Sequence, residues 1–179
     1  MPDPDGHAPH PPRAATGLIV GRFNPPHLGH SHLVTSAAAQ VEHLVVFVNT
    51  RDGEAVPGPL RAGWLAELHP DVTVVEVRHD LDTDFADEAL WERWMALFRA
   101  HWPLPTGPEV VFSSEGYGGE LARRFGAEGV AVDPDRTAVP ISATMIREDP
   151  LAHLDRLAPP VRTWVEAWAQ RPGWGTTRR

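Results

Sequence analysis

Residues 21–30 read GRFNPPHLGH and place two imidazoles three positions apart, directly after a short apolar run. The consecutive prolines fix a turn and delay the helix that follows, because the residue before a proline disfavours the α region. His27 and His30 then project together at the positive end of that helix, beside free backbone amides. This arrangement predicts an anion-binding loop, with phosphate as the expected anion and no lysine required.

Two glycines in this loop, Gly21 and Gly29, allow the backbone to approach a ligand or another segment closely. An ordinary turn with two incidental histidines is the alternative, and the local sequence does not decide between the two. Metal binding by His27, His30 and His32 is a further alternative, although no carboxylate lies at a matching spacing.

A second informative segment, residues 141–147, reads ISATMIR and follows a proline. Ser142 is a favoured residue for the N-cap of a helix. In a helix that starts there, Thr144 and Arg147 share a face and add a hydroxyl and a guanidinium to an amide-rich end. The segment predicts a second anion site, and an ordinary capped surface helix is the alternative.

The elements that position these segments follow from hydrophobic patterning. Short valine-rich runs predict strands buried on both faces: residues 17–21, 44–49, 72–78, 110–113 and 129–133. Helical patterns fill the intervals: residues 30–40, 59–68, 85–101, 117–125 and 160–170. The alternation predicts an α/β domain with a parallel sheet of about five strands and right-handed crossovers. Ligands of such sheets bind outside the carboxyl ends of the strands, where both informative segments are expected.

The ends of the chain differ in composition from its middle. Residues 1–16 contain five prolines and little to bury, so they are expected to form a disordered tail. Residues 17–170 are expected to form a single domain, and residues 171–179 a frayed end. His7 and His10 are read as part of a solvated tail, although they are near enough in sequence to touch a metal.

Composition excludes several classes of chemistry. All 16 basic residues are arginine, which rules out a lysine Schiff base and a P-loop of the GxxxxGK[ST] type. The absence of cysteine rules out disulfides and thiolate nucleophiles. A net charge of -8 argues against a nucleic-acid partner. No stretch approaches the roughly 18–20 apolar residues that span a bilayer, so no membrane partner is expected and a cytoplasmic protein is the default.

Taken together, the two segments resemble the signature of the cytidylyltransferase-like nucleotidyltransferases, GxFxPxHxGH near the start and ISxTxIR near the end. The pattern is closest to the nicotinamide mononucleotide (NMN) adenylyltransferase domain of the NadR type. Further segments fit that domain: residues 61–65, 112–115 and 132–137, together with Trp91 and Trp94. The resemblance covers roughly residues 17–165.

The resemblance implies a Rossmann-like sheet and a transferase reaction. A nucleoside monophosphate passes from an NTP to the phosphate of a second small molecule, with release of pyrophosphate. The expected pair is ATP and NMN, giving NAD, with Mg²⁺ as the cofactor. A CTP-dependent cytidylyltransferase acting on a small phosphate or phosphonate remains an alternative, as does a nucleotide sensor without catalysis. Self-association is left open.

The resemblance also implies roles for individual residues. His27, His30 and Arg147 are expected to be catalytic. The expected nucleotide-binding residues are Gly21, Arg22, Phe23, Gly29, Ser113, Val132, Arg136, Ser142 and Thr144. The expected acceptor-binding residues are Asn24, Trp91 and Trp94, and no metal ligand is named.

Each group has a structural alternative. Arg22 and Arg136 are equally compatible with surface ion pairs. Trp91 and Trp94 fall at near-helical spacing with Phe98, which is equally typical of rings that pack in a core. No nucleophile and base pair is expected, because an ionised acceptor phosphate is already a nucleophile and needs positioning and charge neutralisation.

Overall fold

Five parallel strands in the order β3-β2-β1-β4-β5 form the centre of the computed structural model, which describes residues 13–171. The strands are β1 (Ala14–Gly21), β2 (Val41–Thr50), β3 (Thr73–Arg78), β4 (Val110–Ser113) and β5 (Glu128–Ala131). The predicted α/β class and parallel sheet are confirmed.

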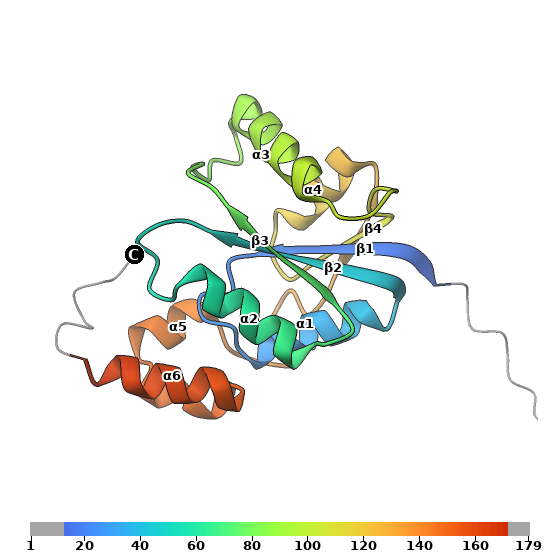
Figure 1. Cartoon of the computed structure of the whole chain (residues 1–179). Coiled ribbons are helices and arrows are strands. Elements are labelled where there is room, and N and C mark those ends of the chain that lie inside the picture. Colours follow the sequence, from blue (N-terminus) through green and yellow to red (C-terminus); the bar gives the residue numbers. More distant parts are fainter. Residues whose placement is uncertain (1–12, 172–179) are drawn as a thin grey trace, which may run out of the picture.

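Helices cover both faces of this sheet (Figure 1). They are α1 (Leu28–Ala38), α2 (Gly58–Leu68), α3 (Glu88–His101), α4 (Gly118–Phe125), α5 (Ala143–Glu148), the 3-10 helix η1 (Leu151–Arg156) and α6 (Pro159–Ala169). Leu33 and Val34 of α1 and Leu65 of α2 pack on one face. Side chains of α3 and α4 pack on the opposite face. Helices α5 and α6 add a third cluster around Ile146 and Val161.

The strand order places a switch point beside β1. The chain runs outward from β1 through β2 to β3, then returns to the other side of β1 to form β4 and β5. Loops that leave neighbouring strands in opposite directions open a crevice at the carboxyl ends, which is where open α/β sheets bind ligands. The segment that follows β1 therefore lies at the binding edge.

Strand β1 begins at Ala14, three residues before the predicted start. The reason is tertiary pairing: the Thr16 hydroxyl donates to the Gly107 carbonyl at 2.8 Å, and the Glu109 amide donates to the Thr16 carbonyl at 3.1 Å. Residues 14–16, which were predicted as part of a disordered tail, therefore belong to the sheet. Residues 1–12 and 172–179 lie outside the described part of the chain.

Helix α3 begins at Glu88, although the pattern predicted a helix from residue 85. The Asp87 carboxylate accepts a hydrogen bond from the Leu90 amide at 3.1 Å and caps the helix. Phe85 consequently lies in the preceding loop. Within residues 13–171, none of the helices has the length and apolar character that a bilayer crossing requires.

Candidate active site

A cavity of about 620 Å³ opens at the carboxyl ends of the strands. Residues that end or follow each of the five strands line it, including Gly21, Asn49, His79, Ser113 and Asp133. The volume is within the range of about 300–1,000 Å³ that is typical of small-molecule sites. The cavity therefore lies where the sheet topology predicts a ligand.

His27 and His30 cap helix α1 through each other. The His30 amide donates to Nδ1 of His27, and the His27 amide donates to Nδ1 of His30, both at 3.3 Å. The two imidazoles stack with ring centroids 3.6 Å apart and an interplanar angle of 19°. Because both Nδ1 atoms accept hydrogen bonds, the ring proton of each histidine lies on Nε2. Both rings line the cavity, so their Nε2–H groups are donors available to a ligand.

Burial keeps this pair neutral. Burial and, secondarily, the charge of Arg136 lower the pKa of His27 to about 3. Burial also lowers the pKa of His30 well below its usual value, with smaller contributions from His27 and Arg136. At neutral pH the two histidines therefore offer hydrogen bonds without positive charge.

Gly29 makes room for this arrangement. A Cβ at this position would lie 3.0 Å from Nδ1 of His27 and 3.1 Å from its Cε1. A side chain there would push the imidazole away from the helix. The absence of a side chain at Gly29 thus lets the His27 ring lie against the start of the helix. The sequence alone indicated a close approach at this glycine but not that the neighbour is His27.

Arg147 joins the two predicted anion segments. Its Nη1 donates to the carbonyl of Asn24 at 2.5 Å, across 123 positions of sequence. Its Nη2 donates to the Thr144 hydroxyl at 3.2 Å on the same helix. Ser142 caps that helix, accepting from the Met145 amide at 3.2 Å. The structure therefore brings the starts of α1 and α5 to one cavity.

Three further arginines line the cavity, Arg22, Arg51 and Arg136. Arg136 forms an ion pair with Glu115 at 2.6 Å, and its side chain is 41% exposed. The ion pair that was the alternative for this residue is thus present in a residue that also lines the cavity. Burial lowers the pKa of Arg147, and Arg22 is the next contributor, so the two guanidiniums lie within electrostatic reach of each other.

Left-handed backbone geometry concentrates at this cavity. Within residues 13–171, the non-glycine residues with positive φ are Phe23 at 50°, Asp133 at 46° and Arg136 at 52°, and all three line it. The Asp133 carboxylate holds its loop by accepting hydrogen bonds from the amides of Thr137 and Ala138 at 2.8 and 3.0 Å. Such geometry is costly for side chains with a Cβ and is commonly retained at functional sites.

Not every predicted nucleotide-binding residue reaches the cavity. Ser113 lines it, and its hydroxyl accepts from the Glu115 amide at 2.9 Å. Val132 does not line it, because its side chain packs into the core beneath the sheet. The Val132 carbonyl accepts from the Ser114 hydroxyl at 2.7 Å, so this position ties two loops together.

The predicted acceptor residues all line the cavity, and each has a side-chain polar atom that is already hydrogen-bonded within the protein. Asn24 is 2% exposed, and its Oδ1 accepts from the Val56 amide at 3.1 Å. The indole Nε1 of Trp91 donates to the carbonyl of Phe85 at 3.2 Å. That of Trp94 donates to the carbonyl of Asp82 at 3.0 Å, and its ring lies 4.4 Å from that of His79.

Sequence reasoning missed several residues of the site. Tyr117 lines the cavity and donates its hydroxyl to the Val20 carbonyl at 2.7 Å, and burial raises its pKa to about 12. Arg61 is fully buried and donates to the carbonyls of Arg22 and Asn49 at 2.5 and 3.2 Å. It does not line the cavity but bonds two residues that do, and its place in residues 61–65, a segment that fits the NadR-type domain, was the only sequence signal for it.

No metal cage is formed by the described residues. Across residues 13–171 there is no group of three or more His, Cys, Asp or Glu side chains placed to hold a metal ion. His27, His30 and His32 therefore do not form the metal site that their spacing allowed.

Comparison with known proteins agrees with this geometry at the level of a class. Residues 18–60, which include the second half of β1, the histidine loop and β2, match the family model described as Cytidylyltransferase-like. The chain also has the fold of a bifunctional NMN adenylyltransferase/ADP ribose pyrophosphatase from Francisella tularensis. That structure is 11% identical with a TM-score of 0.63, over 90% of this chain and 52% of the other.

Particular relatives are NadR proteins and NMN adenylyltransferases. The trifunctional NAD biosynthesis/regulator protein NadR of Escherichia coli strain K12 is 26% identical over 168 residues, 82% of this chain and 39% of the relative. The nicotinamide-nucleotide adenylyltransferase of Aeropyrum pernix is 40% identical over 47 residues, 26% of this chain and 27% of the relative. A NadR crystal structure with NAD and AMP-PNP has a TM-score of 0.58 at 23% identity, over 80% of this chain and 44% of that one.

These matches confirm the predicted resemblance to the cytidylyltransferase-like nucleotidyltransferases, and the homologues found are nucleotidyltransferases. The chain spans about two fifths of the length of the NadR relative, 39%.

Proposed function

We propose that this chain is a nucleotidyltransferase that transfers the adenylyl group of ATP to the phosphate of NMN. The observation that carries the proposal is the hydrogen bond from Arg147 to the Asn24 carbonyl, which joins the two phosphate-type segments around one cavity. The match of residues 18–60 to the Cytidylyltransferase-like model supports the class. The NadR and NMN adenylyltransferase relatives support the choice of ATP and NMN.

The reaction forms one bond and breaks one. An oxygen of the acceptor phosphate attacks the α-phosphorus of ATP, and the bond from that phosphorus to the α,β-bridging oxygen breaks. Pyrophosphate leaves with the electron pair. No proton has to be removed from the nucleophile, so the protein contributes positioning and charge stabilisation.

Named residues divide this work. The Nε2–H groups of His27 and His30 donate to oxygens of the α- and β-phosphates, with His30 the principal donor in the transition state. Ser142 and Thr144 at the start of α5, with Arg147, hold the β- and γ-phosphates that leave. Neutral imidazoles suit this role, because donors fixed before the reaction need no reorganisation when charge moves to the leaving group.

Mg²⁺ is expected to enter with the nucleotide. It keeps most of its waters and is commonly bound by substrate phosphates with few protein ligands. The described residues form no cluster that would hold a resident metal, which fits delivery by the triphosphate. When bound, the ion neutralises charge on the phosphate oxygens.

Pyrophosphate release tests the proposal directly. Each of ATP, CTP, GTP and UTP is paired with NMN, nicotinate mononucleotide, a small sugar phosphate and a phosphonate. We expect turnover with ATP and NMN. Turnover confined to CTP with a small phosphate or phosphonate would contradict the assignment, and nucleotide binding without any pyrophosphate release would indicate a sensor.

A matched pair of variants tests the role of the shared cavity. Arg147→Met is expected to lower kcat by about 100-fold, as for loss of a fixed donor to the reacting group. Arg156→Met is the control, since Arg156 lies in η1 and pairs with Asp155 at 3.0 Å, outside the cavity. Equal activity of the two variants would remove Arg147 from the mechanism.

A further inference from the structure

Trp91 is engaged on several sides. It is 6% exposed, and its Nε1 donates to the Phe85 carbonyl. The guanidinium carbon of Arg124 lies 4.8 Å from the centroid of its ring, in cation–π geometry. A ring so enclosed offers little surface to a ligand, although its residue type led sequence reasoning to assign it to the acceptor.

Phe85 presents the open aromatic surface instead. It lines the cavity and is 58% exposed, the largest exposed fraction among the exposed large hydrophobic side chains of the described chain. Its ring stacks on Tyr117 with centroids 5.7 Å apart at 20°, and Trp91 lies 5.7 Å away. Because Tyr117 is anchored by its hydrogen bond to Val20, Phe85 is supported from beneath while part of its ring stays open.

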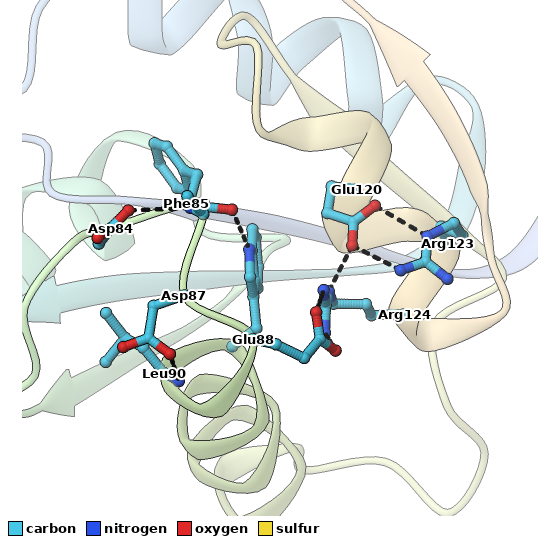
Figure 2. A network of polar contacts seen from close by, with 10 residues as sticks. Asp84, Phe85, Asp87, Glu88, Leu90, Glu120, Arg123 and Arg124 are labelled. Carbon is cyan, nitrogen blue, oxygen red and sulfur yellow. Dashed lines mark hydrogen bonds and ion pairs between the residues drawn. The ribbon is translucent and has the colours of Figure 1, made fainter.

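An ion network on α3 and α4 holds this support in place (Figure 2). Arg124 of α4 forms two hydrogen bonds to Glu88, Nη1 to Oε1 at 2.7 Å and Nη2 to Oε2 at 2.6 Å. Its Nε donates to Glu120 at 2.6 Å. The paired geometry fixes the guanidinium plane more strictly than a single contact would. Glu88 is in the first turn of α3, three residues before Trp91, so the network fixes the start of that helix.

The charges of the network persist over a wide pH range. Hydrogen bonds from Arg123 and Arg124 lower the pKa of Glu120 to about 2. The hydrogen bond from Arg124 also lowers the pKa of Glu88. The Arg124 side chain is only 11% exposed, whereas that of Arg123 is 67% exposed. Arg124 is thus the buried centre of the network and Arg123 its solvated edge.

We propose that Phe85 is the aromatic contact for the flat ring of the acceptor, and that Arg124 is the positioning residue that holds it through Trp91. The inference rests on the proposed function and refines its acceptor side. Asp84 also lines the cavity, and its Oδ1 accepts from the Ala86 amide at 2.9 Å, so its negative charge is held beside Phe85 and favours an acceptor whose ring is cationic. A pyridinium ring meets both conditions, since the face of an aromatic ring attracts a cation.

Steady-state kinetics with NMN and ATP tests the binding role of Phe85. Phe85→Ala is expected to raise the KM for NMN about fivefold to tenfold, in line with loss of one aromatic pair. The KM for ATP and kcat should stay near those of the parent chain. Phe85→Tyr keeps the ring and should restore the KM for NMN. An unchanged KM in Phe85→Ala, in a parent chain that turns over NMN, overturns the assignment.

The positioning role of Arg124 has a matched control in Arg123. Both arginines bind Glu120, but only Arg124 contacts Glu88 and Trp91. Arg124→Met is expected to raise the KM for NMN without changing that for ATP, whereas Arg123→Met should change neither. An equal effect of the two variants, or an equal rise in both KM values for Arg124→Met, overturns the role.

Hydrogen exchange of the peptide that covers residues 82–91 tests the positioning role of Arg124 without requiring turnover. Faster amide exchange in Arg124→Met than in Arg123→Met supports positioning by Arg124, and equal exchange overturns it. If the parent chain fails to release pyrophosphate with NMN, the proposed function fails, while this measurement still decides whether Arg124 orders the loop that carries Phe85.

Discussion

Replacing Arg61 with methionine should destabilise the whole binding edge of the sheet. The side chain is fully buried in α2 and forms an ion pair with Glu54, whose side chain is 8% exposed. It also donates to the carbonyls at the end of β1 and β2, at Arg22 and Asn49. Methionine fills a similar volume but leaves the buried Glu54 carboxylate with the Arg51 amide and no charged partner, and leaves two carbonyls without their shared donor.

The magnitude follows from the buried charge. Breaking a buried ion pair by removing one partner costs about 3–5 kcal/mol. We therefore expect Arg61→Met to lower the free energy of unfolding by about 4 kcal/mol, a large share of the 5–15 kcal/mol that is typical of a domain. At about 2–4 °C per kcal/mol for a chain of this size, the Tm falls by roughly 10 °C.

Urea unfolding followed by circular dichroism measures this loss, and Arg78→Met is the matched control. Arg78 pairs with Asp52 at 2.8 Å, but those side chains are 66% and 94% exposed, so its loss should cost under about 1 kcal/mol. Arg61→Met combined with Glu54→Leu should recover much of the stability, because no unpaired charge remains. A loss in Arg61→Met no larger than in Arg78→Met would refute this reasoning.

Three further predictions concern the histidine loop. His30→Ala should lower kcat about 100-fold while ATP binds with similar affinity, and equal losses in rate and binding would assign His30 to ground-state recognition. Gly29→Ala should lower kcat/KM about tenfold, because the new Cβ displaces His27, while the circular dichroism of the helices is retained. Activity equal to that of the parent chain would show that the reaction tolerates the displaced ring. Because the pKa of His27 is about 3 in the folded chain, only the unfolded chain takes up this proton between its ordinary value of 6.5 and 3. Stability that is present above pH 6.5 is thus lost as pH falls, by about 1 kcal/mol per pH unit. In His27→Gln, the free energy of unfolding measured in urea should therefore differ less between pH 7 and pH 5 than it does in the parent chain.

The parts of the site that could be predicted depend on local rules. Consecutive prolines and a glycine define the loop after β1, and a serine cap defines the start of α5. A parallel sheet sends the carboxyl ends of its strands to one edge, so pattern and topology together were enough to expect His27 and Arg147 near each other. The contact between Arg147 and the Asn24 carbonyl supplies the detail that the sequence did not contain.

The parts that could not be predicted depend on partners distant in sequence. An arginine on an amphipathic helix is normally solvated, and the burial of Arg61 becomes tolerable only when folding brings Glu54 and two strand ends to it. Asn24 was assigned to the acceptor by its place in the loop, and the bond that its amide oxygen accepts from the Val56 amide, 32 positions away, gave no sequence signal. Phe85 gave no signal in the sequence. It lies in the loop because Asp87 caps α3, and the sequence pattern does not distinguish this cap from a helix that begins one turn earlier.

In the cavity of this acidic chain, positive charge and neutral hydrogen-bond donors come from different side chains. With a net charge of -8 and no lysine, attraction for the nucleotide must come from a few arginines. Four of them line the cavity: Arg22, Arg51, Arg136 and Arg147. Two imidazolium rings stacked at 3.6 Å among these guanidiniums would repel one another strongly in the empty cavity. Neutral rings avoid that cost and still present Nε2–H donors. Under the proposed function, the arginines therefore bind charge that is present before the reaction, and the histidines respond to charge that moves to the leaving group. This division is why His30→Ala is expected to reduce the rate more than the affinity.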